Sequence, residues 1–230
     1  MPSRLVARTA PLAAFLVFLV ALTPIAAEET EQALHYDWTL SGVVGFLARA
    51  FLPGHGEGVL RNRLDDEGHL MTELVVTSRS AADDYWRYGS ESDTKADRLL
   101  RAWTSYSFRG KQKSKEKQPA ELGVVEASSL IYRISEDPPT TDRVIRIWWD
   151  GDIHPVRIVP LGVDALSTED GPVDALLFEV RGERHDGKKL PGRVRLWLSL
   201  ADNEPLDFTV SRAFVKVHFR RRHGPRTATP

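Results

Sequence analysis

The chain has 230 residues, of which 42% are hydrophobic and 27% are charged, a composition typical of folded globular proteins. Its 31 basic and 32 acidic residues give a formal net charge of -1, which argues against a dedicated nucleic-acid-binding protein. It has no cysteine, so disulfides, thiol catalysis and cysteine-ligated metal sites are excluded. This length allows one large domain or two small ones, stabilised mainly by an apolar core.

The N-terminus has the pattern of a secretory signal peptide. Two arginines in the first eight residues precede an uncharged, apolar run over residues 10–25, and Ala26 and Ala27 then precede an acidic pair. This order of basic, apolar and small residues is typical of a leader that is cleaved on export. We therefore expect residues 1–27 to be a signal peptide, residues 28–230 to be a single exported β-rich domain, and the location to be the periplasm. The alternative is an uncleaved N-terminal membrane anchor, since the run is near the shortest length that spans a bilayer.

The first half of the mature chain is predicted to contain strands separated by polar segments. The strands are expected at residues 33–40, 57–64, 69–78 and 99–109. Residues 65–68 form a hairpin loop between the second and third of them, and residues 53–56 form a turn. Residues 42–51 suit either a strand or a short helix. The polar stretch at residues 80–97 is expected to be irregular, and the lysine-rich segment 111–117 to be a mobile, solvated loop.

One helix is predicted, at residues 121–134. Leu122, Val125, Ser129 and Tyr132 are spaced so that they lie near one helical face. Asp137, followed by two prolines, ends the segment, because proline does not continue a helix.

Beyond residue 143, apolar and polar side chains alternate with a period of two. Two hairpins are expected, at residues 144–159 around an Asp-Gly turn and at residues 174–200 around residues 185–188, followed by a run over residues 206–220. Because alternate residues face opposite sides of a sheet, this half predicts an antiparallel meander with one apolar and one mostly polar face. Fourteen large residues share the apolar face: Ile145, Ile147, Trp149, Val156, Ile158, Leu176, Phe178, Val180, Val194, Leu196, Leu198, Leu206, Phe208 and Val210. The predicted fold class is mainly β, an antiparallel curved sheet, half-barrel or barrel-like, with one short helix near residues 121–134.

The polar face of this sheet carries the candidate binding surface. Trp148 and Trp197 occur there with Arg157 and Arg195. Indole rings can contact an apolar or sugar ligand while guanidinium groups bind an anionic group, so these four residues are the predicted ligand-binding site. The alternative is a structural ladder of arginines stacked on tryptophans.

Familiar catalytic constellations are missing from the sequence. It contains no His-Glu-x-x-His zinc motif and no Gly-x-Ser-x-Gly nucleophile elbow, and its seven histidines are scattered singly. We therefore predict no catalytic residue, no metal ligand and no cofactor. The carboxylate pairs Asp65/Asp66 and Asp150/Asp152 are assigned to turns, where aspartate bonds the local backbone.

Several short segments of the second half are distinctive: residues 127–133 (ASSLIYR), 174–180 (DALLFEV) and 195–199 (RLWLS), with Asp202 and Pro205 following. Together they resemble an exported bacterial family known only as a domain of unknown function, DUF3108. The resemblance is best after about Gly123. It implies a periplasmic, largely antiparallel β protein shaped like the half-barrel of lipoprotein carriers, and it brings no catalytic residues.

The predicted function is that of a non-enzymatic periplasmic or envelope-associated protein that binds a lipid-like or glycan ligand on a curved sheet. One alternative is an envelope hydrolase that uses loop residues such as His154 beside Asp150 and Asp152. Another is a structural or interaction protein of the cell envelope. The basic C-terminal tail, residues 220–230, is predicted to be disordered or to touch anionic lipid headgroups.

Overall fold

A computed structural model describes residues 30–41, 54–81, 83–119, 122–149, 151–168, 171–183, 189–212 and 215–222. The predictions for residues 1–27, 42–51 and 185–188, for Asp150 and for the tail beyond residue 222 lie outside these ranges and stay predictions. Within the described ranges, no helix is both long and apolar enough to cross a bilayer.

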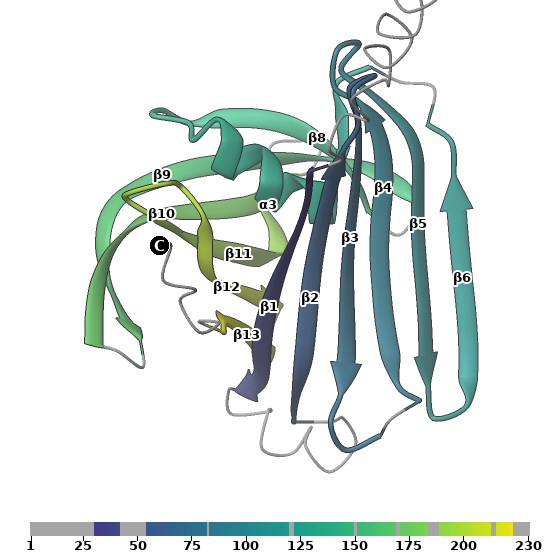
Figure 1. The fold of residues 1–230 in the computed structure, drawn as a ribbon, viewed down its shortest axis with the longest axis horizontal. Coiled ribbons are helices and arrows are strands. Elements are labelled where there is room, and N and C mark those ends of the chain that lie inside the picture. The colour runs from purple at the N-terminus through teal and green to yellow at the C-terminus, as the bar shows by residue number, and fades with distance from the viewer. Residues whose placement is uncertain are drawn as a thin grey trace, which may run out of the picture.

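The described residues form a mainly β protein with one short helix, which confirms the predicted fold class (Figure 1). The elements are β1 (Thr30–Ser41), β2 (His55–Leu64), β3 (His69–Ser78), β4 (Tyr85–Asp93), β5 (Arg98–Phe108), β6 (Lys111–Lys117), β7 (Val124–Glu126), α3 (Ala127–Glu136), β8 (Arg143–Trp149), β9 (Asp152–Thr168), β10 (Gly171–Glu183), β11 (Lys189–Ser199), β12 (Pro205–Arg212) and β13 (Val215–Arg221).

All thirteen strands belong to one sheet, in the order β6-β5-β4-β3-β2-β1-β13-β12-β11-β10-β9-β8-β7. It consists of two antiparallel meanders joined where the first strand pairs with the last, with Trp38 opposite Phe219. Only the short β7 runs parallel to its neighbour, β8. The sheet bends strongly, so that β1–β6 stand across β8–β13 with α3 between them (Figure 1).

The main apolar cluster lies on the inner face of this bend. Inner-face side chains of both meanders meet there with Leu130, Ile131 and Ile134 of α3. Twelve of the fourteen residues that the period-two pattern places on the apolar face belong to this cluster or pack against it. The two exceptions are Trp149, which is 44% exposed, and Leu206, which packs on the outer face. Leu206 is displaced because a β-bulge falls between the pairs Trp197–Asp207 and Leu198–Pro205.

The two ends of the sheet overlap instead of pairing edge to edge. Trp148 lies on the face of β8 opposite to Ile147, yet it packs with Leu99 and Ala102 of β5 and with Val124 of β7. The outer face of β8 is therefore covered by β5, and an isolated bridge between Arg98 and Leu122 links the same regions. We call this overlap, defined by Leu99, Ala102, Val124 and Trp148, the seam.

Two polar segments of the first half are strands, contrary to expectation. Residues 80–97, predicted to be irregular, contain β4, whose inner positions include the fully buried Ser90 and nearly buried Ser92. Residues 111–117, predicted to be a loop, form the edge strand β6. Neither shows a sustained apolar alternation: the inner positions of β4 are aromatic at Trp86 and Tyr88 but serine at Ser90 and Ser92, and the corresponding positions of β6 are lysines. His55 and Gly56, predicted to lie in a turn, open β2.

The helix begins later than predicted. α3 starts at Ala127, because Gly123 has a positive φ of 65° and the next three residues pair with β8. Its end matches the expected stop, since the backbone N–H of Asp137 donates to the carbonyl of Arg133 and two prolines follow.

Candidate functional site

The structure places three of the four predicted ligand-binding residues on one outer surface and the fourth in the seam. Arg157, Arg195 and Trp197 lie on the outer face of β9 and β11, whereas Trp148 is fully buried. The four therefore do not form one exposed surface. Ligand binding by Arg157, Arg195 and Trp197 stays a prediction.

Each of the three outer residues has a partner within the protein. Arg157 Nε lies 2.6 Å from Glu183 Oε1, and Arg195 Nε lies 3.0 Å from Glu179 Oε2. Trp197 is 9% exposed, and its indole N–H donates to Asp164 Oδ2 over 2.9 Å. No Arg–Trp ladder joins them: the two cation–π contacts within the described ranges are Arg101 over Trp103 and Arg109 over Phe108.

A different group of residues, on the inner face, forms the candidate site. Asn62, Thr72 and Ser90 lie directly opposite one another on β2, β3 and β4, and all three are buried. Their side-chain atoms Asn62 Oδ1, Thr72 Oγ1 and Ser90 Oγ have no hydrogen-bond partner within the described part of the chain. We call these three residues the inner polar row.

The inner polar row lies between rows of apolar side chains on the inner face of the sheet. The neighbouring row along the strands contains Leu60 and Leu74, and the row on the other side contains Leu64 and Leu70. α3 packs against β3 and β4, the strands that carry Thr72 and Ser90. A strip of polar atoms thus crosses the inner face of β2, β3 and β4 close to the helix.

Further buried polar atoms without partners lie on elements that adjoin this strip. They are Thr104 Oγ1 on β5, Glu126 Oε1 at the start of α3, Arg133 Nε on α3 and Trp148 Nε1 on β8. Together with the inner polar row they make seven of the eight such atoms recorded for the described residues; the eighth, Asp207 Oδ2, belongs to the outer face. This concentration is unusual, because folded proteins pair nearly all of their buried polar groups.

Glu126 is the one ionisable side chain that is completely buried beside α3. It caps the helix: its carboxylate oxygen Oε2 accepts from the backbone N–H of Ser128 over 2.6 Å and from the Ser128 hydroxyl. Its other oxygen, Oε1, has no partner among the described residues. Burial raises the pKa of Glu126 to about 7, although the hydrogen bonds from Ser128 oppose this shift. The side chain can therefore change its protonation state near neutral pH.

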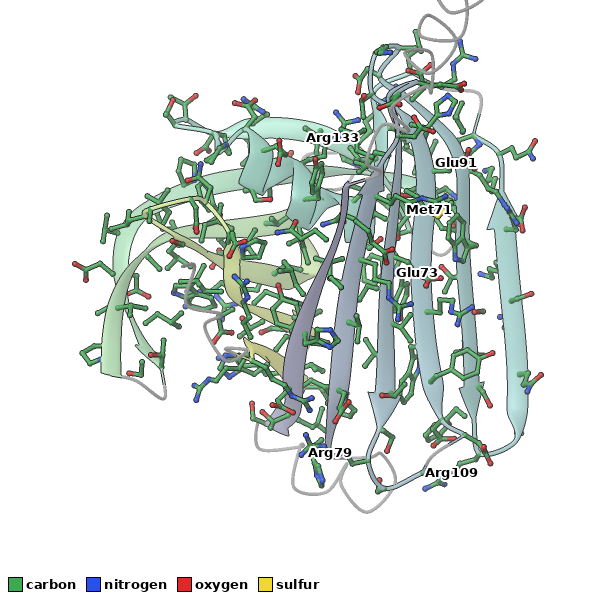
Figure 2. The ribbon with its side chains drawn as sticks, in the orientation of Figure 1. Met71, Glu73, Arg79, Glu91, Arg109 and Arg133 are labelled. Atoms are coloured by element: carbon green, nitrogen blue, oxygen red, sulfur yellow. The ribbon has the colours of Figure 1, made fainter. Side chains whose placement is uncertain are left out.

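The C-terminal part of α3 is tied to the turn between β4 and β5. Arg133, in the last turn of α3 (Figure 2), has its Nη2 3.5 Å from Asp97 Oδ1. The carbonyl of Asp97 also accepts from the backbone N–H of Gly123, just before β7. One turn thus holds both the helix and the segment that leads into it.

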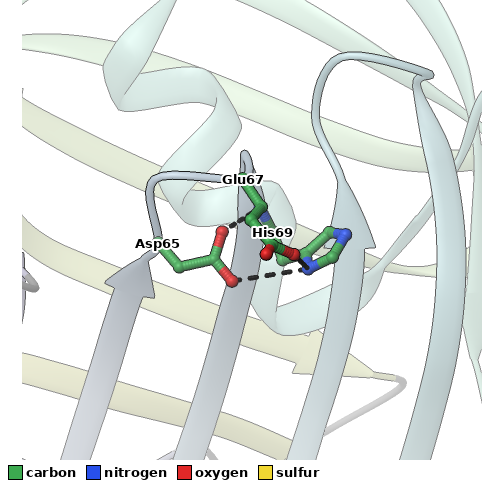
Figure 3. Close-up of side chains that lie close together, drawn as sticks. All are labelled: Asp65, Glu67 and His69. Atoms are coloured by element: carbon green, nitrogen blue, oxygen red, sulfur yellow. Dashed lines mark hydrogen bonds and ion pairs between the residues drawn. The ribbon is translucent and has the colours of Figure 1, made fainter.

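One cluster has the composition of a metal site but is explained by its turn. Asp65, Glu67 and His69 lie together at the hairpin between β2 and β3 (Figure 3). Asp65 Oδ1 accepts from the backbone N–H of His69 over 2.7 Å, and this bond is the main reason that the pKa of Asp65 is lowered. An aspartate that bonds the backbone of its own turn is what the sequence predicts for this loop.

The sequence analysis missed the inner polar row, although a signal for it exists. Thr72, Ser90 and Ser92 occupy the inner parity of β3 and β4, where the second half of the chain has leucine, valine and phenylalanine. Once a strand has been recognised, a polar residue at a position that faces the apolar core indicates a buried polar group. β4 was predicted to be irregular, so this signal could not be used.

Comparison with solved structures gives weak similarities, among them the two that follow. No family model matches the chain, and no curated protein matches its sequence. A β-barrel-like protein of the domain of unknown function DUF1849 from Brucella abortus is 9% identical, with a TM-score of 0.39 over 84% of this chain and 96% of that one. A LolA superfamily protein from Nitrosomonas europaea is 7% identical, with a TM-score of 0.34 over 86% of this chain and 89% of that one.

Proposed function

We propose that this is an exported, envelope-associated, non-enzymatic protein that binds an amphiphilic, lipid-like molecule inside the bent sheet, beneath α3. The observation that carries the proposal is the inner polar row, three buried side chains whose oxygen atoms Asn62 Oδ1, Thr72 Oγ1 and Ser90 Oγ have no hydrogen-bond partner among the described residues. The signal-peptide pattern of residues 1–27 supports the periplasm as its location.

Energetics favour an occupant for the inner polar row. A buried donor or acceptor without a partner costs about 1–3 kcal/mol. Asn62, Thr72 and Ser90 together would then cost several kcal/mol, which is comparable to the whole stability of a small domain. A molecule that offers hydrogen bonds to this row removes that cost, so binding and stability are coupled.

The surroundings of the row favour an amphiphile over a purely polar ligand. The polar atoms lie between rows of leucines, on the same inner face as the apolar cluster to which α3 contributes Leu130, Ile131 and Ile134. A ligand whose polar group meets Asn62, Thr72 and Ser90 must place its remainder against this apolar surface. An acyl chain suits that position, because it can make the apolar contacts with the sheet that α3 makes when no ligand is bound.

Entry of such a ligand requires movement of α3. The helix has ten residues and is held by its apolar face, by the ion pair of Arg133 with Asp97 and by the ion pair of Arg143 with Asp137, 2.9 Å apart. Both ion pairs are largely exposed and contribute little individually. Because α3 is not part of the sheet's hydrogen-bonded ladder, it can leave the inner face without breaking any strand pairing.

The proposal is tested by isolating the exported protein without detergent and analysing it by native mass spectrometry and by solvent extraction. We expect a bound amphiphile in the wild type and at least a tenfold lower occupancy in the variant Thr72→Val with Ser90→Ala. The matched control, Thr77→Val with Ser105→Ala, removes the same groups from the outer faces of β3 and β5 and should retain the ligand.

The proposal is contradicted if the protein binds no amphiphile. A wild-type protein that carries only water, and that does not bind an added fluorescent fatty acid, would show that the inner polar row is simply hydrated. The double variant should then gain stability in denaturant titrations without any change in ligand occupancy.

A further inference from the structure

The outer face of the second meander carries a row of cations that crosses five strands. Arg157, Arg181, Arg193, Ser211 and Lys216 lie directly opposite one another on β9, β10, β11, β12 and β13. Neighbouring strands are about 4.8 Å apart, so the row spans roughly 20 Å. Like charges in directly opposed positions destabilise a sheet. Arg157 opposite Arg181, and Arg181 opposite Arg193, are two such pairs in succession.

The charge of this row is only partly balanced at the surface. Arg157, at one end, lies within 4 Å of Glu183 and Asp142. The remaining cations of the face are Arg181, Arg193, Arg195, Lys216 and Arg220, and we call these five residues the cationic face. The carboxylates beside it, Glu179 and Asp207, have side chains that are only 2% and 1% exposed.

The buried carboxylates act as anchors for the cations above them. Glu179 accepts from Arg181 and, over 3.0 Å, from Arg195, and Arg193 Nη1 lies 3.8 Å away. Burial tends to raise the pKa of Glu179, but the hydrogen bonds from the two arginines outweigh it and hold the pKa below its ordinary value. The arginines are thereby fixed in place while their outer N–H groups stay in solvent, since Arg193 is 55% and Arg195 40% exposed. Fixed guanidinium groups are suited to phosphate oxygens.

We propose that the cationic face docks on an anionic lipid bilayer through the phosphate groups of its headgroups. Charge complementarity supports this partner, and the face is broad enough to meet several headgroups at once. A bilayer fits better than a nucleic acid, because Trp197, the tryptophan on this face, is nearly buried and offers no ring for base stacking.

Vesicle co-sedimentation tests the proposal with the full mature chain. We expect binding to vesicles of phosphatidylcholine with 30% phosphatidylglycerol, and weak binding to phosphatidylcholine alone. The variant Arg193→Gln, Lys216→Gln, Arg220→Gln should weaken binding to the anionic vesicles roughly 100-fold, and high salt should weaken the wild type similarly. This variant keeps Arg181 and Arg195 on Glu179, so the buried carboxylate stays paired.

A matched control removes the same charge from the opposite half of the sheet. Arg61→Gln, Arg87→Gln, Arg101→Gln lie on the outer faces of β2, β4 and β5, and their side chains are 48–52% exposed. Binding should persist in this variant. An equal loss in both variants would overturn the proposal, because attraction would then follow net charge alone. Equal binding to uncharged vesicles, full competition by millimolar inorganic phosphate, or preference for single-stranded RNA over vesicles would overturn it as well.

Discussion

At the scale of single residues, Glu126 gives the protein a pH-dependent stability. Its folded pKa of about 7 lies above its ordinary value of 4.5, so the folded state keeps a proton that the unfolded chain has lost between these two pH values. The contribution of Glu126 to the free energy of unfolding is therefore largest below pH 4.5, and it is lost as the pH rises through about 7. At about 1.4 kcal/mol per pKa unit, the loss amounts to roughly 3 kcal/mol.

The variant Glu126→Gln should remove this dependence, since glutamine keeps the shape and an acceptor for the N–H of Ser128 but does not titrate. Urea unfolding at a series of pH values between 4.5 and 8 measures the effect. Glu136→Gln, at the exposed end of the same helix, serves as the control and should retain the wild-type slope. A slope that survives in Glu126→Gln would mean that Glu126 is already ionised in the folded protein.

At the scale of elements, β6 shows how an exposed edge strand is kept from pairing with other molecules. Its sequence, KQKSKEK, alternates lysine with polar residues, and the lysines lie opposite inner-parity residues of β5 such as Thr104 and Tyr106. Charged side chains that point inward at an edge disfavour the addition of another strand. Lys113→Val with Lys115→Val should therefore cause concentration-dependent self-association, measured by light scattering coupled to size exclusion.

The conservative variant Lys113→Arg with Lys115→Arg keeps the charges and should remain in the same state as the wild type. If the valine variant also shows no self-association at high concentration, then β6 is protected by something other than its lysines.

The strands themselves were predictable from the sequence to different degrees. The alternation of large apolar residues identified β8, β10, β11 and β12 together with the side that each turns to the core, because hydrophobic burial decides that side. β4 and β6 were not predicted, since the inner face of β4 changes from aromatic residues to serine along the strand and the inner positions of β6 hold lysine. The inner polar row could not be predicted without β4.

At the scale of the whole molecule, the seam determines which faces of the sheet are exposed to solvent. Trp148 was expected on a polar, open face because its parity along β8 is that of Arg146. It is buried instead, since β5 covers this face. A local sequence pattern does not predict that the two ends of a sheet overlap. The same parity argument places Arg157, Arg195 and Trp197 on the outer face, where they lie, although Trp197 is only 9% exposed because it packs with other apolar residues there.

Adjacent tryptophans provide a direct test of the overlap. Trp148→Ala should lower the free energy of unfolding by about 3–5 kcal/mol, because it leaves a cavity between β5 and β8. Trp149→Ala, one residue further along and 44% exposed, should cost less than about 1 kcal/mol. Chemical denaturation of both variants gives the comparison. Equal costs would mean that the seam opens in solution.

The pairing of the first strand with the last has a consequence for biogenesis. Asp37 on β1 and Arg222, just after β13, bond each other across 185 residues, and β1 has no partner on that side until β13 has been made. At about 5–20 residues per second, a ribosome needs roughly 10 to 40 seconds to cover that distance. Throughout this interval the growing polypeptide lacks the β1–β13 ladder, so the two meanders can join only when synthesis is nearly finished.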